Sequence, residues 1–98
     1  DNASGTATTL EAFRILVESG IRPNRTIQFM GYAGEEVGLL GSQDIAQKFK
    51  RDGKTVASVL QLDMTMYPGS DPKIVFMEDY TNSELTRFMG RLIDAYVK

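Results

Sequence analysis

Two adjacent carboxylates stand in the middle of the stretch Gly31-Tyr32-Ala33-Gly34-Glu35-Glu36-Val37-Gly38-Leu39-Leu40-Gly41-Ser42, which begins inside an apolar run from residue 27 to residue 33. The glycines around this pair allow the backbone to turn sharply and to approach a ligand closely. Consecutive side chains at a strand end point in opposite directions, so Glu35 and Glu36 are expected to have separate roles. One can bind a metal ion while the other moves a proton, and the alternative is a solvated acidic loop.

The composition is that of one small globular domain. The chain has 98 residues, of which 42% are hydrophobic and 24% are charged. A net charge of -2 gives no electrostatic reason to expect nucleic acid or an anionic membrane as a partner. The sequence contains neither cysteine nor histidine, which excludes disulfides and leaves only oxygen ligands for any metal that this chain holds alone.

Helical spacing of apolar residues predicts three helices. The first runs from about Ser4 to Ser19, where Ser4 can cap the start and Gly20 suits the end. The second runs from about residue 42 to residue 52. The third begins at a capping box of Thr81 and Glu84. It carries a continuous apolar stripe that is interpreted as core, formed by Leu85, Phe88, Met89, Leu92, Ile93 and Tyr96.

Apolar runs predict strands between these helices. The runs are Ile27–Ala33, Val56–Met64 and the short Ile74–Met77, and the first two are apolar enough to be covered on both faces. A strand, a helix and a second strand in this order form a parallel unit. The expected fold class is therefore α/β, a three-layer α/β/α arrangement with a mostly parallel sheet of about three strands and three helices.

The acidic residues follow the ends of these predicted strands. Glu35 and Glu36 follow the first strand, and Asp63 closes the apolar run of the second, so all three are expected at one edge of the sheet, where ligands bind in such folds. Asp1 is a fourth candidate and precedes the first helix; its position there is also explained if the segment is simply the start of a helix. A cluster of Asp1, Glu36 and Asp63 would require cations and could hold two metals, while Glu35 could act as general base.

Three segments carry a resemblance to the M28-type di-zinc aminopeptidases, close to the secreted bacterial leucyl aminopeptidases. They are Asp1-Asn2-Ala3-Ser4-Gly5, the run from Met30 to Leu39 with Gly41-Ser42, and Leu60-Gln61-Leu62-Asp63-Met64-Thr65. The resemblance covers essentially the whole chain, which looks like the central segment, truncated at both ends, of the larger zinc-exopeptidase fold.

The resemblance implies a role for each matching residue. Asp1 would bridge the two zinc ions, Glu36 would bind one of them and Asp63 the other, and Glu35 would be the catalytic general base. Met64 sits beside the ligand Asp63, and Met77 matches a position in the family's apolar pocket for the substrate's N-terminal side chain; both are candidate substrate contacts, although both could equally be ordinary core residues.

The sequence lacks part of the zinc site that the family uses. Each family zinc also needs a histidine, one upstream of Asp1 and one downstream of Lys98, and this chain has none. The resemblance thus implies a secreted metalloaminopeptidase that removes hydrophobic N-terminal residues from peptides, whereas the isolated 98-residue chain is expected to be inactive. Exposed sheet edges would favour its self-association.

Three rival functions remain open at this point. The first is another M28-like exopeptidase, such as a carboxypeptidase or a dipeptidase. The second is a non-catalytic module that keeps the peptidase fold for binding. The third is a magnesium site for phosphoryl transfer, which lacks the glycine-rich loop with lysine that such sites use.

Overall fold

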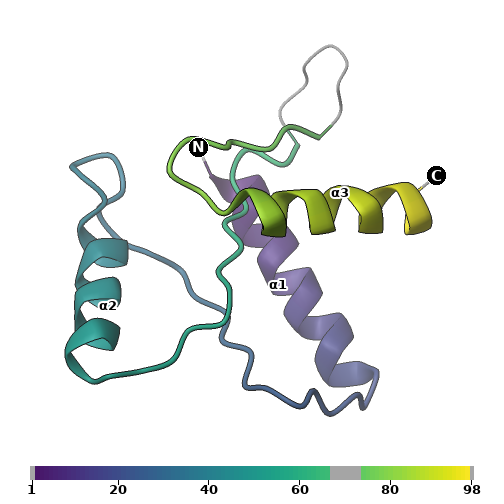
Figure 1. Cartoon of the computed structure of the whole chain (residues 1–98), viewed down its shortest axis with the longest axis horizontal. Helices are drawn as coiled ribbons and strands as arrows, with labels where there is room; N and C mark the ends of the chain where they lie inside the picture. The colour runs from purple at the N-terminus through teal and green to yellow at the C-terminus, as the bar shows by residue number, and fades with distance from the viewer. Residues whose placement is uncertain (1, 67–73, 98) are drawn as a thin grey trace. The chain divides into compact units, whose positions relative to one another are not determined.

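The computed structural model describes residues 2–66 and 74–97. The chain divides into two compact units, Asp1–Tyr67 and Pro68–Lys98. The first unit contains α1 (Ala3–Glu18) and α2 (Leu40–Arg51), and the second contains α3 (Ser83–Tyr96), as Figure 1 shows. The other described residues form turns and irregular segments.

The predicted α/β fold class is wrong for the residues that the structure describes. They form three helices and no strand, so the sheet expected from 27–33, 56–64 and 74–77 is absent there. A strand requires a ladder of backbone hydrogen bonds to a neighbour. Here the ends of two of these segments bond to helix starts instead: the Ala33 carbonyl accepts from Gly41 N–H, and the Leu62 carbonyl accepts from the Asn2 side chain.

The apolar side chains of these segments also lack the cover that a sheet would need. Val59 is 65% exposed and Leu60 is 55% exposed, and no apolar side chain among the described residues is buried. Phe13 of α1 and Phe29 make an edge-to-face contact with ring centroids 5.3 Å apart. Since no sheet edge is present in the described residues, the expected self-association through such edges has no structural basis there.

The helices occur close to where their patterns predict them, but two caps differ. The first N-cap is Asn2 rather than Ser4, and the third is Asn82 rather than Thr81. Each asparagine accepts a hydrogen bond from the amide three residues ahead, Gly5 N at 3.1 Å and Leu85 N at 2.9 Å. Both caps satisfy an amide that a helix start leaves without an internal partner.

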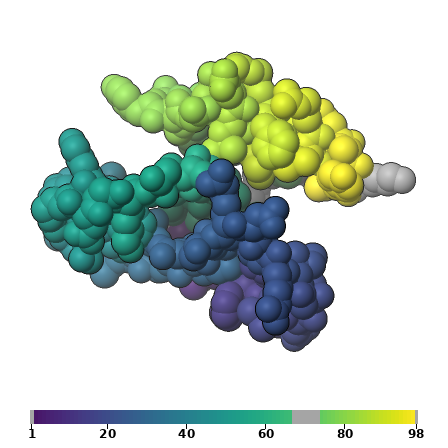
Figure 2. All heavy atoms as spheres, turned by 60° about the horizontal axis from the view of Figure 1, so that its bottom comes forward, coloured from purple at the N-terminus to yellow at the C-terminus, as the bar shows by residue number. Residues whose placement is uncertain are grey.

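The apolar stripe of α3 is only partly covered. Leu85, Met89, Leu92 and Ile93 are half-buried, whereas Phe88 and Tyr96 are exposed. In the space-filling view the yellow-green and yellow atoms of α3 lie at the surface (Figure 2). The prediction that the whole stripe is core is therefore wrong for its two aromatic members.

No helix in the described ranges combines the length and the apolar character that a membrane crossing needs.

Candidate functional site

The loop that carries Glu35 and Glu36 is closed by backbone hydrogen bonds at the start of α2. Leu40 N–H donates to the Gly34 carbonyl at 3.1 Å, and Gly41 N–H donates to the Ala33 carbonyl at 2.9 Å. Within the loop the Glu35 carbonyl accepts from Leu39 N–H at 2.9 Å. These bonds join the end of the apolar segment 27–33 directly to the first turn of α2, so the loop is short and its ends are held together.

This closure depends on glycine at position 41. A Cβ at Gly41 would lie 2.7 Å from the Ala33 oxygen and 2.8 Å from the Ala33 nitrogen, which is too close for a side chain. Gly34 has φ of 67° and Gly38 has φ of 114°, values that favour glycine. The predicted sharp turn at these glycines is confirmed. The close approach that the structure shows is between Gly41 and the Ala33 backbone, and the predicted approach to a ligand stays a prediction.

Asn2 joins the start of α1 to the residues on both sides of Asp63. Its Nδ2 donates to the Leu62 carbonyl at 3.1 Å, and its Oδ1 accepts from Met64 N–H at 3.2 Å. A second link connects the same elements, because the hydroxyls of Thr8 and Thr65 lie 2.9 Å apart. The sequence alone showed Asn2 only as part of the segment Asp1–Gly5 that carries the family resemblance, since no periodic pattern relates a residue to partners 60 positions away.

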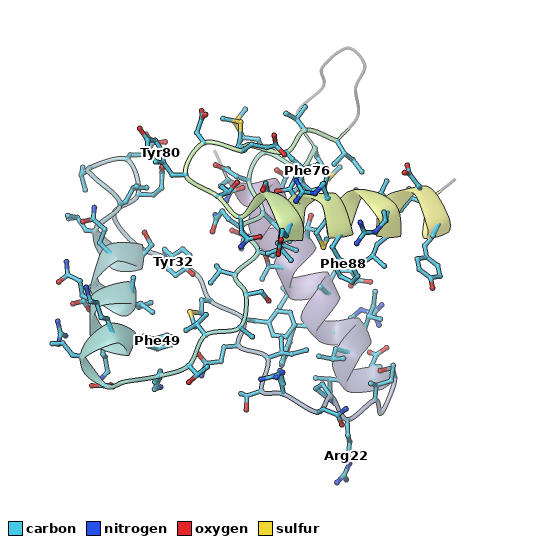
Figure 3. The ribbon with its side chains drawn as sticks, viewed as in Figure 1. Arg22, Tyr32, Phe49, Phe76, Tyr80 and Phe88 are labelled. Atoms are coloured by element: carbon cyan, nitrogen blue, oxygen red, sulfur yellow. The ribbon has the colours of Figure 1, made fainter. Side chains whose placement is uncertain are left out.

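One pocket of about 280 Å³ brings two of the predicted site residues together. Glu35 and Asp63 both line it, together with Tyr32, Ala33, Leu39, Ser42 and Gln61. Tyr32 and Phe49 are drawn on the same side of α2 in Figure 3. Glu36 is not among the lining residues of this pocket. Glu35, Glu36 and Asp63 are all exposed.

The two predicted substrate-contact residues, Met64 and Met77, are exposed. Asp1 lies outside the described residues. Met64 follows Asp63 with a left-handed φ of 50° and is 49% exposed. Met77 belongs to the second unit and is 72% exposed. Within residues 2–66 and 74–97, no three acidic side chains are grouped closely enough to hold a metal ion.

A larger hollow of about 490 Å³ lies along α1 and carries no comparable chemistry. Every residue that lines it comes from this one helix, so it is a helix flank rather than a site built from several elements. Its charged residues already pair with one another. Arg14 bonds Glu11 at 2.7 Å and also pairs with Glu18. The Glu35–Asp63 pocket is therefore the candidate site.

Comparison with known proteins defines the class of this chain. The sequence profile described as Peptidase family M28 matches residues 1–98, the whole chain. The chain belongs to this family, as its three motifs predicted.

Several curated relatives are aminopeptidases from fungi. A protein named as a probable aminopeptidase of Saccharomyces cerevisiae is 42% identical over 104 residues, covering 99% of this chain and 28% of the yeast protein. Leucine aminopeptidase 1 of Paracoccidioides brasiliensis is 39% identical over 106 residues, covering 98% of this chain and 27% of its own length. The chain thus spans little more than a quarter of these relatives. No solved structure is significantly similar to it.

The M28 family is zinc-dependent, and the described residues fit zinc only in part. Exposed carboxylate oxygens at Glu36 and Asp63 have the charge and donor type for a divalent cation. Zinc sites in proteins usually take four ligands and favour nitrogen or sulfur, and the sequence contains no histidine or cysteine. The chain therefore offers oxygen donors alone, which do not by themselves match the usual ligand set of zinc.

Proposed function

We propose that this chain is the central segment of the catalytic domain of an M28 metalloaminopeptidase that removes hydrophobic N-terminal residues from peptides. The proposal rests most directly on the pocket shared by Glu35 and Asp63, which come from two segments far apart in the sequence. The aminopeptidase names of the relatives support the choice of an N-terminal exopeptidase. The remainder of the catalytic domain would lie outside the 98 residues.

Glu35 is the proposed general base. Its carboxylate is exposed in the pocket and accepts the proton of the attacking water, a role that a positioned carboxylate can perform. Asp1, Glu36 and Asp63 are the proposed carboxylate ligands of two zinc ions, with Asp1 as the bridge. The complete enzyme would supply one histidine to each zinc from outside this chain. This division gives the chain the proton-transfer residue and the oxygen ligands.

Substrate contacts are proposed for two methionines. Met64 directly follows the proposed ligand Asp63, and Met77 is proposed to join the apolar pocket for the substrate's first side chain. Flexible, polarizable side chains of this kind adapt to apolar groups of different shape. The resemblance to secreted leucyl aminopeptidases supports secretion of the complete enzyme.

Substitution of single carboxylates in the complete enzyme tests these roles. Glu35→Gln is expected to lower kcat on an amino-acyl anilide by about 10²–10⁴-fold with zinc still bound, because only proton transfer is removed. Asp63→Asn is expected to lower the zinc content itself. Glu78→Gln changes an exposed carboxylate of the second unit and serves as the control. Full activity of the Glu35→Gln enzyme would refute the proposed base.

A further inference from the structure

The Asn2 side chain makes three hydrogen bonds with two different parts of the first unit. Its Oδ1 accepts from Gly5 N–H at 3.1 Å inside α1 and from Met64 N–H at 3.2 Å. Its Nδ2 donates to the Leu62 carbonyl at 3.1 Å. The two long-range partners are the residues immediately before and after Asp63. A single side chain thus holds the backbone on both sides of this carboxylate.

Only a carboxamide of this length can make all three bonds. Its oxygen has two acceptor lone pairs and its nitrogen has two donor hydrogens. A carboxylate can only accept, and a serine side chain is too short to reach α1 and the Leu62–Met64 backbone at the same time. Gly5 leaves the room that this arrangement needs. A Cβ at Gly5 would collide with Asn2 Oδ1 and with the Leu62 oxygen.

The conformation held by Asn2 is one that the chain would not adopt freely. Met64 has a backbone φ of 50°, in the left-handed region that residues other than glycine, asparagine and aspartate rarely occupy. Such a conformation persists where the surroundings over-determine it. The Oδ1 bond to Met64 N–H supplies a constraint at the strained residue, next to Asp63.

We infer that Asn2 is a positioning residue for Asp63, which sets the place of this carboxylate in the pocket that it shares with Glu35. The inference rests on the proposed function only for the role of Asp63 as a metal ligand. The hydrogen bonds of Asn2 are observed in the structure and do not depend on that role. Because the same oxygen caps α1, the start of this helix is tied to the backbone on both sides of Asp63.

Asn82 provides a matched comparison within the same chain. It caps α3 through Leu85 N–H at 2.9 Å, as Asn2 caps α1 through Gly5 N–H. Among the contacts of the described residues, Asn82 has no side-chain bond to a distant segment. Asn2 therefore acts both as a cap and as a long-range clamp, whereas among the described contacts Asn82 acts as a cap.

The test uses Asn2→Ser and Asn82→Ser in the complete enzyme loaded with zinc. Serine caps helices about as well as asparagine, so neither change is expected to alter the helix starts greatly. Asn2→Ser is expected to weaken zinc binding by about 10–100-fold in competition with a chelator, the usual effect of removing a residue that orients a metal ligand. Saturating zinc should restore kcat with KM unchanged. Amide hydrogen exchange at Met64 should accelerate in this variant only.

The outcomes separate the two proposals. Unchanged zinc affinity and unchanged Met64 exchange in Asn2→Ser would overturn the positioning role, as would an equal loss of zinc affinity in Asn82→Ser. Faster exchange at Met64 together with weaker zinc binding supports it, even where the variant is less stable. A wild-type enzyme that binds no zinc would overturn the proposed function and with it the role of Asp63 as a ligand, whereas Met64 exchange still reports on the clamp.

Discussion

Replacement of Gly41 by alanine should destabilise the protein, although alanine is the better helix former. Gly41 is the second residue of α2, where helix propensity alone favours alanine by at most about 1 kcal/mol. The added Cβ would lie 2.7 Å from the Ala33 oxygen, well inside the ordinary contact distance of roughly 3.5–4.0 Å. The sign of the effect therefore depends on whether the loop can move.

The loop cannot move without breaking the bond that closes it. Gly41 N–H donates to the same Ala33 oxygen at 2.9 Å, so relief of the collision separates donor from acceptor. A lost hydrogen bond costs about 1 kcal/mol, and overpacking costs about 1–3 kcal/mol. After subtraction of the propensity gain, Gly41→Ala should lower the free energy of unfolding by about 1–3 kcal/mol.

Gly90→Ala is the matched control. Gly90 also lies in a helix, α3, and nothing comes within 4 Å of a Cβ built on it. The same substitution there should raise stability by about 0.5–1 kcal/mol through helix propensity alone. Chemical denaturation of both variants of the complete enzyme, at constant m, measures the two changes. Equal stabilisation by both alanines would refute the close approach at Gly41.

Three further predictions concern the isolated chain and two contacts of α1. The purified 98-residue chain should show no chelator-sensitive turnover of an amino-acyl anilide with added zinc, because it supplies carboxylates without histidine; turnover would contradict the proposed division of the site. Gly5→Ala should disrupt the tie between α1 and Leu62 and accelerate amide exchange at Met64, whereas Gly20→Ala, with no neighbour within 4 Å of its Cβ, should leave that exchange unchanged. The hydrogen bond from Arg14 lowers the pKa of the Glu11 carboxyl below its usual 4.5. The stabilisation that this bond gives to folded α1 is therefore fully present above pH 4.5 and is lost as the pH falls through the lowered pKa of Glu11. An NMR titration should show the Glu11 midpoint rising in Arg14→Gln, and an unchanged midpoint would exclude this pairing.

Local signals predicted local structure well. The spacing of apolar residues located the three helices, and Gly20 and Gly53 follow α1 and α2 with φ of 67° and 64°. The caps were displaced by one or two residues, because serine, threonine and asparagine all suit this position and sequence alone does not rank them. Family membership was also predictable, since it depends on motifs rather than on packing.

Sheet formation was not predictable from the same signals. An apolar run such as Val56–Met64 indicates a segment that can be covered, but the pairing partner and the covering layer are properties of other residues. In the described structure the carbonyl of Leu62 bonds a side chain at the start of α1, and Val59 remains 65% exposed. The α/β prediction assumed partners that the described residues do not provide.

The candidate site is consequently organised by helix starts. The first turn of α2 bonds Ala33 and Gly34, directly before Glu35, while the cap of α1 bonds both neighbours of Asp63. Glu35 thus directly follows backbone groups that are bonded to the start of α2, and Asp63 lies between backbone groups that are bonded to the cap of α1. Since the two ties use different helices, Gly41→Ala and Asn2→Ser should perturb Glu35 and Asp63 separately. At saturating zinc, kcat should stay low in Gly41→Ala, where Glu35 is displaced, and should recover in Asn2→Ser; this is the pattern that the arrangement requires.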